Sequence, residues 1–222
     1  MTIKIGWNAN TLRMTDILPI IPEPLDIGVD SHFVTPWASR TWVVRSPFDM
    51  HVSCTPTEKG LNLEWLDKSF ELPPYEVFDI TPRKFWRTPE SPTIQWRLNN
   101  LFVADEPVWA ETCAPFLHYP ASQWPGVMIA GKLDIYRWTR PVQWVFEWKD
   151  YSRELHIKRG EPIKYVRFHS SKMNAEFELV QIESSRELEQ AMARCAKVVP
   201  FKGNALSFLD KALARRPKKW IK

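Results

Sequence analysis

Two short acid–histidine pairs are the residues of this sequence best suited to bind a metal. Asp30 is followed two positions later by His32, and Asp49 by His51. Residues two apart in a strand share a face, so each pair could offer a carboxylate and an imidazole to one cation. The His-x-Asp/Glu order of iron oxygenases follows none of the five histidines. The four residues are therefore candidate metal ligands, and a solvated or hydrogen-bonded histidine is the more common alternative.

Nucleophilic catalysis is a second possible chemistry. Cys113 and Cys54 are the candidate nucleophiles, with His118 or His51 as the base that would activate them. Nothing in the sequence places a histidine against a cysteine, and a free cysteine is usually a small buried hydrophobic residue. A Gly-x-Ser-x-Gly motif is also absent. Acyl-transfer chemistry is therefore not favoured.

The segment from Gly126 to Leu133 comes within one residue of a phosphate-binding loop. Leu133 stands where that motif needs a hydroxyl group for Mg²⁺, and the preceding Trp124-Pro125 is not a buried strand. Residues 133–138 have a strand pattern where the phosphate-binding helix should begin. The sequence therefore predicts a strand that is entered through a Pro-Gly turn.

Aromatic side chains beside cations are the most distinctive feature. The chain has twelve tryptophans, more than most cores of this size need, so we expect some to line a surface for protein contacts, sugar stacking or cation–π binding. Residues 84–87 and 136–140 interleave basic and aromatic side chains, as single-stranded nucleic-acid platforms do. Structural stacking of arginine on tryptophan is the alternative. The candidate binding residues are Trp86, Arg87, Trp138, Arg140, Trp144 and Trp148.

Basic residues gather toward the C-terminus. Residues 1–150 hold 14 Lys and Arg against 18 Asp and Glu, whereas residues 151–222 hold 16 against 8, so net charges of −4 and +8 make up the total of +4. Such a basic end could bind phosphates nonspecifically. A solvated helix end, where the helix dipole favours cations, is the simpler alternative. The densest basic run contains Arg215, Arg216, Lys218 and Lys219.

Polar and apolar residues alternate with period two through most of residues 1–183, which is the pattern of β-strands. The clearest case places Val142, Trp144, Phe146 and Trp148 on one face. Further strands are expected at 3–7, 41–45, 51–54, 61–66, 75–80, 93–102, 128–138, 154–158, 163–168 and 177–182.

The fold class that follows is mainly β (α+β), an antiparallel β-sandwich or jelly-roll-like body with two C-terminal helices. We expect residues 1–183 to form a β-rich domain with an extended, proline-rich N-terminal arm. Residues 184–222 are expected to form a helical, basic tail packed on the same domain. Ser184 and Glu187 fit a capping box before the first helix, and residues 205–214 form the second.

Composition narrows the function classes. The chain has 222 residues, of which 44% are hydrophobic and 25% charged, as in soluble globular proteins. Seven glycines against 19 prolines disfavour dinucleotide-binding folds. Three distant cysteines suggest neither a disulfide framework nor a cysteine-based zinc site. Neither a secretory signal nor a membrane-spanning segment is apparent, so a cytoplasmic protein is expected.

Several motifs between residues 93 and 182 follow one another in a characteristic order. They are Leu101-Phe102, Trp124-Pro125-Gly126-Val127, the run from Gly131 to Trp138, the strand 142–148, and Arg159-Gly160-Glu161-Pro162-Ile163. This order resembles an uncharacterised bacterial and phage family that is known only as a domain of unknown function. The resemblance implies a compact β-rich protein of phage or bacterial origin, and it brings no established activity or catalytic residue.

Three function classes remain. The leading expectation is a non-catalytic binding or assembly protein that uses a Trp-rich surface to hold a protein partner or a second copy of itself. The alternative is a jelly-roll enzyme with a metal, of the oxygenase type, or a binder of sugars or other small molecules. The third is nucleic-acid binding through the basic C-terminus. The sequence identifies no cofactor.

Overall fold

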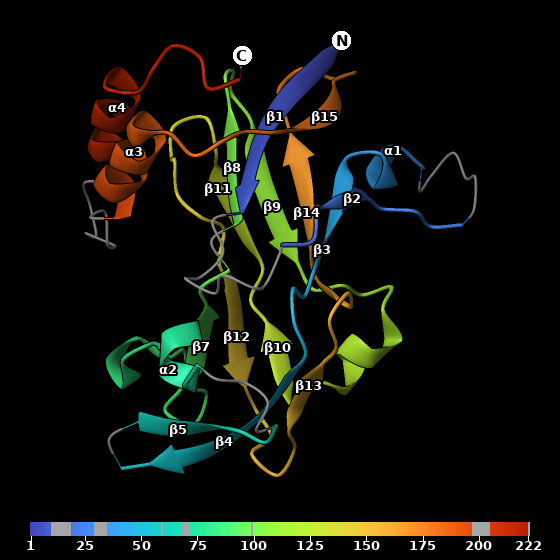
Figure 1. The fold of residues 1–222 in the computed structure, drawn as a ribbon, viewed down its shortest axis with the longest axis vertical. Coiled ribbons are helices and arrows are strands. Elements are labelled where there is room, and N and C mark those ends of the chain that lie inside the picture. Colours follow the sequence, from blue (N-terminus) through green and yellow to red (C-terminus); the bar gives the residue numbers. More distant parts are fainter. Residues whose placement is uncertain are drawn as a thin grey trace.

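Strands make up most of the computed structural model, which describes residues 1–9, 19–28, 35–58, 60–67, 72–98, 100–196 and 205–221. These residues form four sheets and two longer helices near the C-terminus. All neighbouring strands in the sheets run antiparallel except one parallel pair. In Figure 1, two sheets occupy the upper half of the molecule and two the lower half. The strand-rich architecture confirms the predicted fold class and is consistent with a β-sandwich.

The first upper sheet has the strand order β15-β1-β8, with the bounds Glu176–Gln181, Thr2–Ala9 and Asn100–Ala104. The central strand β1 pairs antiparallel with β8 but parallel with β15. It buries Ile3, Ile5 and Trp7. A Cβ atom on Gly6 would lie only 2.8 Å from Val103, so glycine permits the close approach of β8. The structure thus places residues 2–9 inside a sheet, and an N-terminal arm can begin only after Ala9.

The second upper sheet has the order β11-β9-β14-β3-β2, with the bounds Gly131–Asp134, Trp109–Cys113, Pro162–His169, Thr41–Arg45 and Glu23–Pro24. Strand β9 was not predicted. Its buried residues are the small Ala110 and Thr112, whereas Trp109 and Glu111 point to the outer face. Large residues outside and small ones inside weaken the polarity contrast on which period-two prediction depends.

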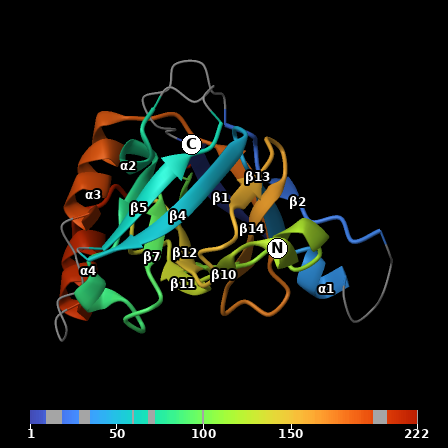
Figure 2. The ribbon, with the colours of Figure 1, turned by 90° about the horizontal axis from the view of Figure 1, so that it is seen from below.

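The lower half contains a four-stranded sheet, β10-β12-β7-β6, with the bounds Gly126–Met128, Trp144–Trp148, Thr93–Trp96 and Phe78–Ile80. A three-stranded sheet, β13-β4-β5, has the bounds Leu155–Ile157, Met50–Thr57 and Gly60–Trp65. Seen from below, β4 and β5 cross in front of the other strands (Figure 2). The short helices are α1 (Thr35–Ala38), α2 (Pro74–Val77), and the 3₁₀ helices η1 (Arg83–Phe85) and η2 (Tyr119–Gln123).

The predicted strand at 75–80 is therefore wrong in its first half. Pro74 opens α2, because a proline at the first helical position has the required φ and lacks only an amide that would be unpaired there. The strand predicted at 128–138 is only partly correct, because β10 and β11 are separate strands of different sheets and residues 135–138 lie outside any strand. The phosphate-binding helix is absent there, as expected. A Cβ atom on Gly126 would collide with the carbonyl oxygen of Glu147, so this glycine serves strand pairing.

The core runs through both halves, and residues from all four sheets belong to one buried cluster. Val142, Trp144, Phe146 and Trp148 lie in it, as their alternation predicts. Trp144 stacks on Phe146 with ring centroids 4.9 Å apart, and Trp96 meets Trp144 edge-on at 5.9 Å. These aromatic contacts are favourable beyond the area that they bury.

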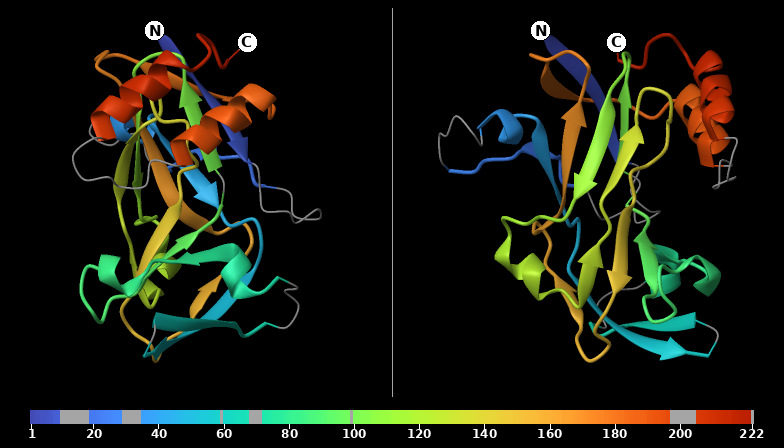
Figure 3. Two further views of the ribbon diagram at one scale, coloured as in Figure 1. Left: turned by 90° about the vertical axis from the view of Figure 1, so that its left-hand side faces the viewer. Right: turned by 180° about the vertical axis from the view of Figure 1, so that it is seen from behind.

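Helices α3 (Arg186–Ala196) and α4 (Ala205–Ala214) lie side by side on one flank of the upper half (Figures 1 and 3). Leu188 of α3 packs on Leu101 and Val103 of β8. The helix is capped one residue later than predicted, because Ser185 rather than Ser184 accepts a hydrogen bond from the amide of Leu188 (3.2 Å). Within the described ranges, no helix is both long and apolar enough to span a membrane.

Candidate functional site

The predicted metal ligands do not form a described metal site. Asp30 and His32 lie outside the described residues. The Asp49 carboxylate accepts a hydrogen bond from the Arg159 amide (2.7 Å). His51 lies in β4, where its Nε2 is 2.6 Å from a carboxylate oxygen of Glu154. Over the part of the chain that the structure describes, no three His, Cys, Asp or Glu side chains are grouped so that they could hold a metal ion.

Among the described contacts, none joins a candidate nucleophile to the histidine predicted to activate it. Cys54 is buried, whereas His51 points to the opposite face of the same strand. Burial raises the pKa of Cys54 to about 12, so it stays a thiol at neutral pH. Burial and the nearby Glu111 raise the pKa of Cys113 as well. All three cysteines are free, and the arrangement favours packing over catalysis.

The tryptophans build the core more than the surface, which corrects the expectation of a Trp-lined face. Trp144 and Trp148 were predicted to bind a partner, yet both are completely buried. Trp86 and Trp138 are half-buried. The indole N–H of Trp86 donates to the Thr81 carbonyl (2.6 Å), which fixes its ring. All twelve tryptophans are buried or half-buried, because each bulky indole fills space between or beside the sheets.

Arg87 forms a structural ion pair with Glu147 of β12, an inner strand of the four-stranded sheet. Its Nε and Nη2 donate to the two oxygens of Glu147 at 3.0 and 2.6 Å. Lys149 binds the same carboxylate. The hydrogen bonds from Arg87 are the main reason that the pKa of the buried Glu147 falls to about 2. The guanidinium is thus committed to a neighbour, although much of the side chain remains exposed.

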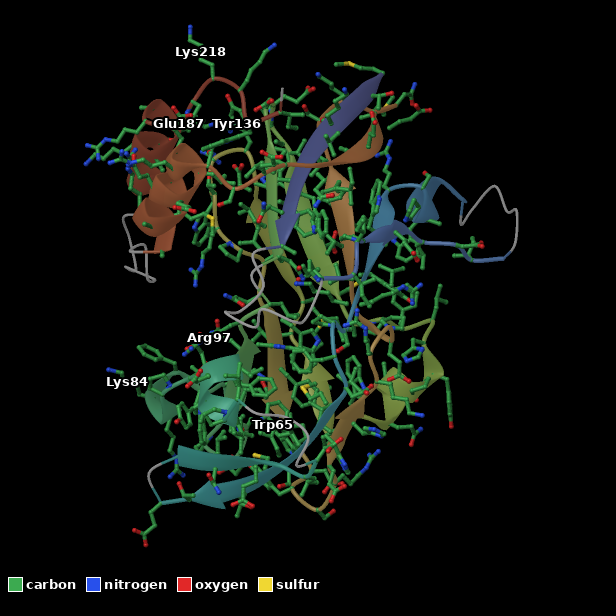
Figure 4. The ribbon with its side chains drawn as sticks, viewed as in Figure 1. Trp65, Lys84, Arg97, Tyr136, Glu187 and Lys218 are labelled. Carbon is green, nitrogen blue, oxygen red and sulfur yellow. The ribbon has the colours of Figure 1, made fainter. Side chains whose placement is uncertain are left out.

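The two basic-aromatic segments do not form one platform. In Figure 4, Lys84 lies beside α2 in the lower half, whereas Tyr136 lies close to α3 in the upper half. Arg140 stacks on Trp138 with its guanidinium carbon 5.6 Å from the ring centroid. Stacking of this kind was the alternative to a nucleic-acid platform. Arg140 also lines a small groove of about 230 Å³, together with residues of β7, β11 and β12.

The basic tail has one buried member. Arg216 is only 6% exposed, lies over the rings of Tyr136 and Trp220, and donates to Asp105 at 3.2 Å. Asp105 also accepts from the amides of Trp220 (2.7 Å) and Ile221 (3.1 Å). Arg216 therefore anchors the chain end, while Arg215, Lys218 and Lys219 stay exposed.

An exposed aromatic surface appears where none was predicted. Phe116 and Leu117, between β9 and η2, are 59% and 55% exposed, and Tyr119, the first residue of η2, is 77% exposed. The ring of Phe116 packs between Trp37 and Tyr165, with centroid distances of 5.3 Å to each. We call these five residues the aromatic face. The sequence signal was a short apolar run, residues 114–120, that begins beside one proline and ends at another.

Charged residues adjoin the aromatic face on the outer side of the five-stranded sheet. Strand register places Lys132, Glu111 and Arg167 next to one another on β11, β9 and β14. Glu111 binds the ring Nε2 of His169 at 2.5 Å. Arg167 lies 5.8 Å over the Trp37 ring. No carboxylate among the described residues is within ion-pair distance of Arg167, and its buried Nε has no acceptor among them.

Comparison with protein-family models and with curated proteins found no match. The resemblance over residues 93–182 therefore stays an expectation from the sequence. Function has to be argued from the surfaces themselves, and the aromatic face with its adjoining arginine is the most distinctive surface described above.

Proposed function

We propose that this chain is a non-catalytic binding or assembly module whose aromatic face docks on a protein partner. The exposure of Phe116, Leu117 and Tyr119 in one short segment supports the proposal. Large apolar groups gathered at one place on a surface are typical of interaction sites. Burying one such side chain in an interface is worth about 1.5–3 kcal/mol.

The partner's chemistry follows from what surrounds the face. Phe116 contacts the rings of both Trp37 and Tyr165, so part of its side-chain freedom is already lost before a partner binds. Arg167, which has no ion-pair partner in the described part of the chain, adds a cation beside them. Aromatic residues and arginine are the types that most often dominate binding energy. The expected partner surface is therefore apolar with an acidic rim, on another protein or on a second copy of this chain.

The finer setting is part of the same proposal. Three free cysteines that are not paired with each other suit a reducing compartment, so we place the module in the cytoplasm of a bacterium or of a phage's host. The phage or bacterial origin rests only on the sequence resemblance over residues 93–182.

Phe116→Ser is the test variant, and Phe85→Ser is its matched control. Phe85 is 61% exposed, close to the value for Phe116, but belongs to η1 on the opposite side of the molecule. We expect crosslinking from the native source, together with light scattering, to recover a complex of the wild-type chain. Its affinity should fall about tenfold or more with Phe116→Ser and stay unchanged with Phe85→Ser. A strict monomer with no crosslinked partner, or equal losses in both variants, would contradict the proposal.

The other function classes have less support. The described residues contain no cluster of side chains that could bind the metal of a metal-dependent enzyme. Nucleic-acid binding through the tail would have to do without Arg216, which the fold already uses, and would rest on Arg215, Lys218 and Lys219. Small-molecule binding has one observation in its favour, the small groove that Arg140 helps to line.

A further inference from the structure

Two histidines lie directly opposite each other on the outer face of the three-stranded sheet, in the lower half of the molecule (Figure 1). The residues on either side of His51 in β4 are buried, so the alternation of side chains along the strand turns His51 outward. The same alternation in β13 leaves His156 exposed. The sequence suggested Asp49 as the partner of His51, whereas strand pairing gives it His156. Both imidazole rings are accessible from solution.

The two rings are close enough to share one ion. The ring centroids of His51 and His156 are 5.0 Å apart. Two imidazoles that bind one tetrahedral ion through bonds of about 2.0–2.1 Å have their centroids roughly 5 Å apart. The pair can therefore bind an ion by rotation of the two side chains, without any movement of the strands.

A carboxylate holds one of the two rings. An oxygen of Glu154 lies 2.6 Å from Nε2 of His51. When Nε2 donates its proton to Glu154, the lone pair of the neutral ring is on Nδ1, which can bind a metal. Histidines that bind metals usually have such an acceptor on their second nitrogen. Within the described part of the chain, no group forms a hydrogen bond with the His156 ring, so its nitrogens are available as well.

We propose that His51 and His156 together bind one divalent transition-metal ion, and that Glu154 orients His51 for this binding. Imidazole nitrogens favour Zn²⁺, Ni²⁺ and Cu²⁺, whereas Mg²⁺ and Ca²⁺ prefer oxygen ligands. Catalytic zinc usually has three protein ligands, and the described residues contain no such group. Two histidines, with water at the remaining positions, therefore bind the ion reversibly on the sheet surface. This site does not depend on the proposed docking function.

Calorimetry on the full chain at neutral pH tests the site, with Cu²⁺, Zn²⁺ and Mg²⁺ each added alone as a chloride. We expect one Zn²⁺ per chain, tighter binding of Cu²⁺ and no binding of Mg²⁺. Zn²⁺ should also shift the NMR signals of the His51 and His156 rings and leave that of His169 unchanged. Absence of Cu²⁺ and Zn²⁺ binding at concentrations up to about 1 mM, or equal affinity for Mg²⁺, would overturn the proposal.

Variants show whether the ion binds between the two strands. His51→Gln and His156→Gln should each weaken Zn²⁺ binding about tenfold or more, because each removes one of the two ligands. Glu154→Gln should weaken it about tenfold and change the His51 tautomer seen by nitrogen NMR. His169→Gln is the matched control, since His169 also contacts a carboxylate, that of Glu111, but lies on β14.

The control should bind Zn²⁺ as the wild type does. Equal weakening in His169→Gln would show nonspecific binding to histidines, and undiminished binding by His51→Gln or His156→Gln would place the ion elsewhere. Either result would contradict a shared site. Circular dichroism of each variant confirms that it is folded.

Discussion

At the scale of single residues, Lys164 is the least expected feature of the core. It lies on β14 and is completely buried, and its ammonium nitrogen donates to the Val142 carbonyl at 2.5 Å. The structure describes no carboxylate beside it. Burial without a counter-charge lowers the pKa of Lys164 from 10.5 to about 7. Glu147 shows the opposite case, because a buried carboxylate between Arg87 and Lys149 keeps its charge down to about pH 2.

The lowered pKa of Lys164 makes stability depend on pH. Between about pH 7 and 10.5 the unfolded chain holds a proton at this lysine that the folded chain does not, so the free energy of unfolding rises with pH. Below pH 7 both states are protonated, and the folded state bears the full cost of a buried charge. Lys164→Met should therefore be more stable than the wild type at pH 6. The difference should shrink by roughly 3–5 kcal/mol by pH 10.

Urea unfolding at pH 6, 8 and 10 measures this difference. Lys84→Met is the control, since Lys84 is exposed and the substitution removes the same charge. A constant difference between wild type and Lys164→Met across this range would show that Lys164 stays charged in the folded protein.

At the scale of elements, the start of α3 depends on one hydroxyl. Ser185 caps the helix through the Leu188 amide, whereas the Ser184 hydroxyl contacts the exposed carboxylate of Glu189 (3.0 Å). Leu188 is also the residue that seats α3 on β8, so the cap and the main apolar contact lie within one turn. Fixing the cap therefore also fixes the packing of the helix.

Ser185→Ala should lower the free energy of unfolding by about 1 kcal/mol, the usual cost of a lost N-cap. Ser184→Ala should cost less than half as much, since it removes an exposed contact between side chains. Chemical denaturation of both variants gives the comparison. If Ser184→Ala proved the more damaging change, the cap would lie at Ser184, as the sequence pattern alone suggests.

At the scale of the whole molecule, the chain end closes the upper half. The Asp105 carboxylate, directly after β8, binds Arg216, Trp220 and Ile221. The Asp105 side chain thus joins the end of β8 to the last residues of the chain, and their position depends on this contact. Loss of this carboxylate should free the tail without unfolding the sheets.

Asp105→Ala should make trypsin cleave after Lys218 and Lys219 several-fold faster, because cleavage requires local release of the chain. Glu106→Ala is the matched control, since the neighbouring carboxylate contacts the exposed Lys172 instead. Mass spectrometry of timed digests measures both rates. Equal rates for Asp105→Ala and the wild type would show that other contacts hold the tail.

The sequence determined the class of fold and the faces of its clearest strands. Period-two alternation correctly placed Val142, Trp144, Phe146 and Trp148 on one buried face, because side chains of a strand must alternate. The helical period after residue 184 and the residue range 205–214 also predicted α3 and α4. These features depend on steric interactions between residues that are close in the sequence, so the sequence alone can predict them.

Only the tertiary structure decided which surfaces exist. Alternation says that Trp144 and Trp148 share a face, but packing of another layer determines that this face is covered while Phe116 stays exposed. The sequence could not show that Arg216 is buried against Asp105, since the two are 111 residues apart. The groove likewise requires β7, β11 and the start of β12 to converge. Exposure and convergence depend on contacts between distant segments, and these are set by the whole core.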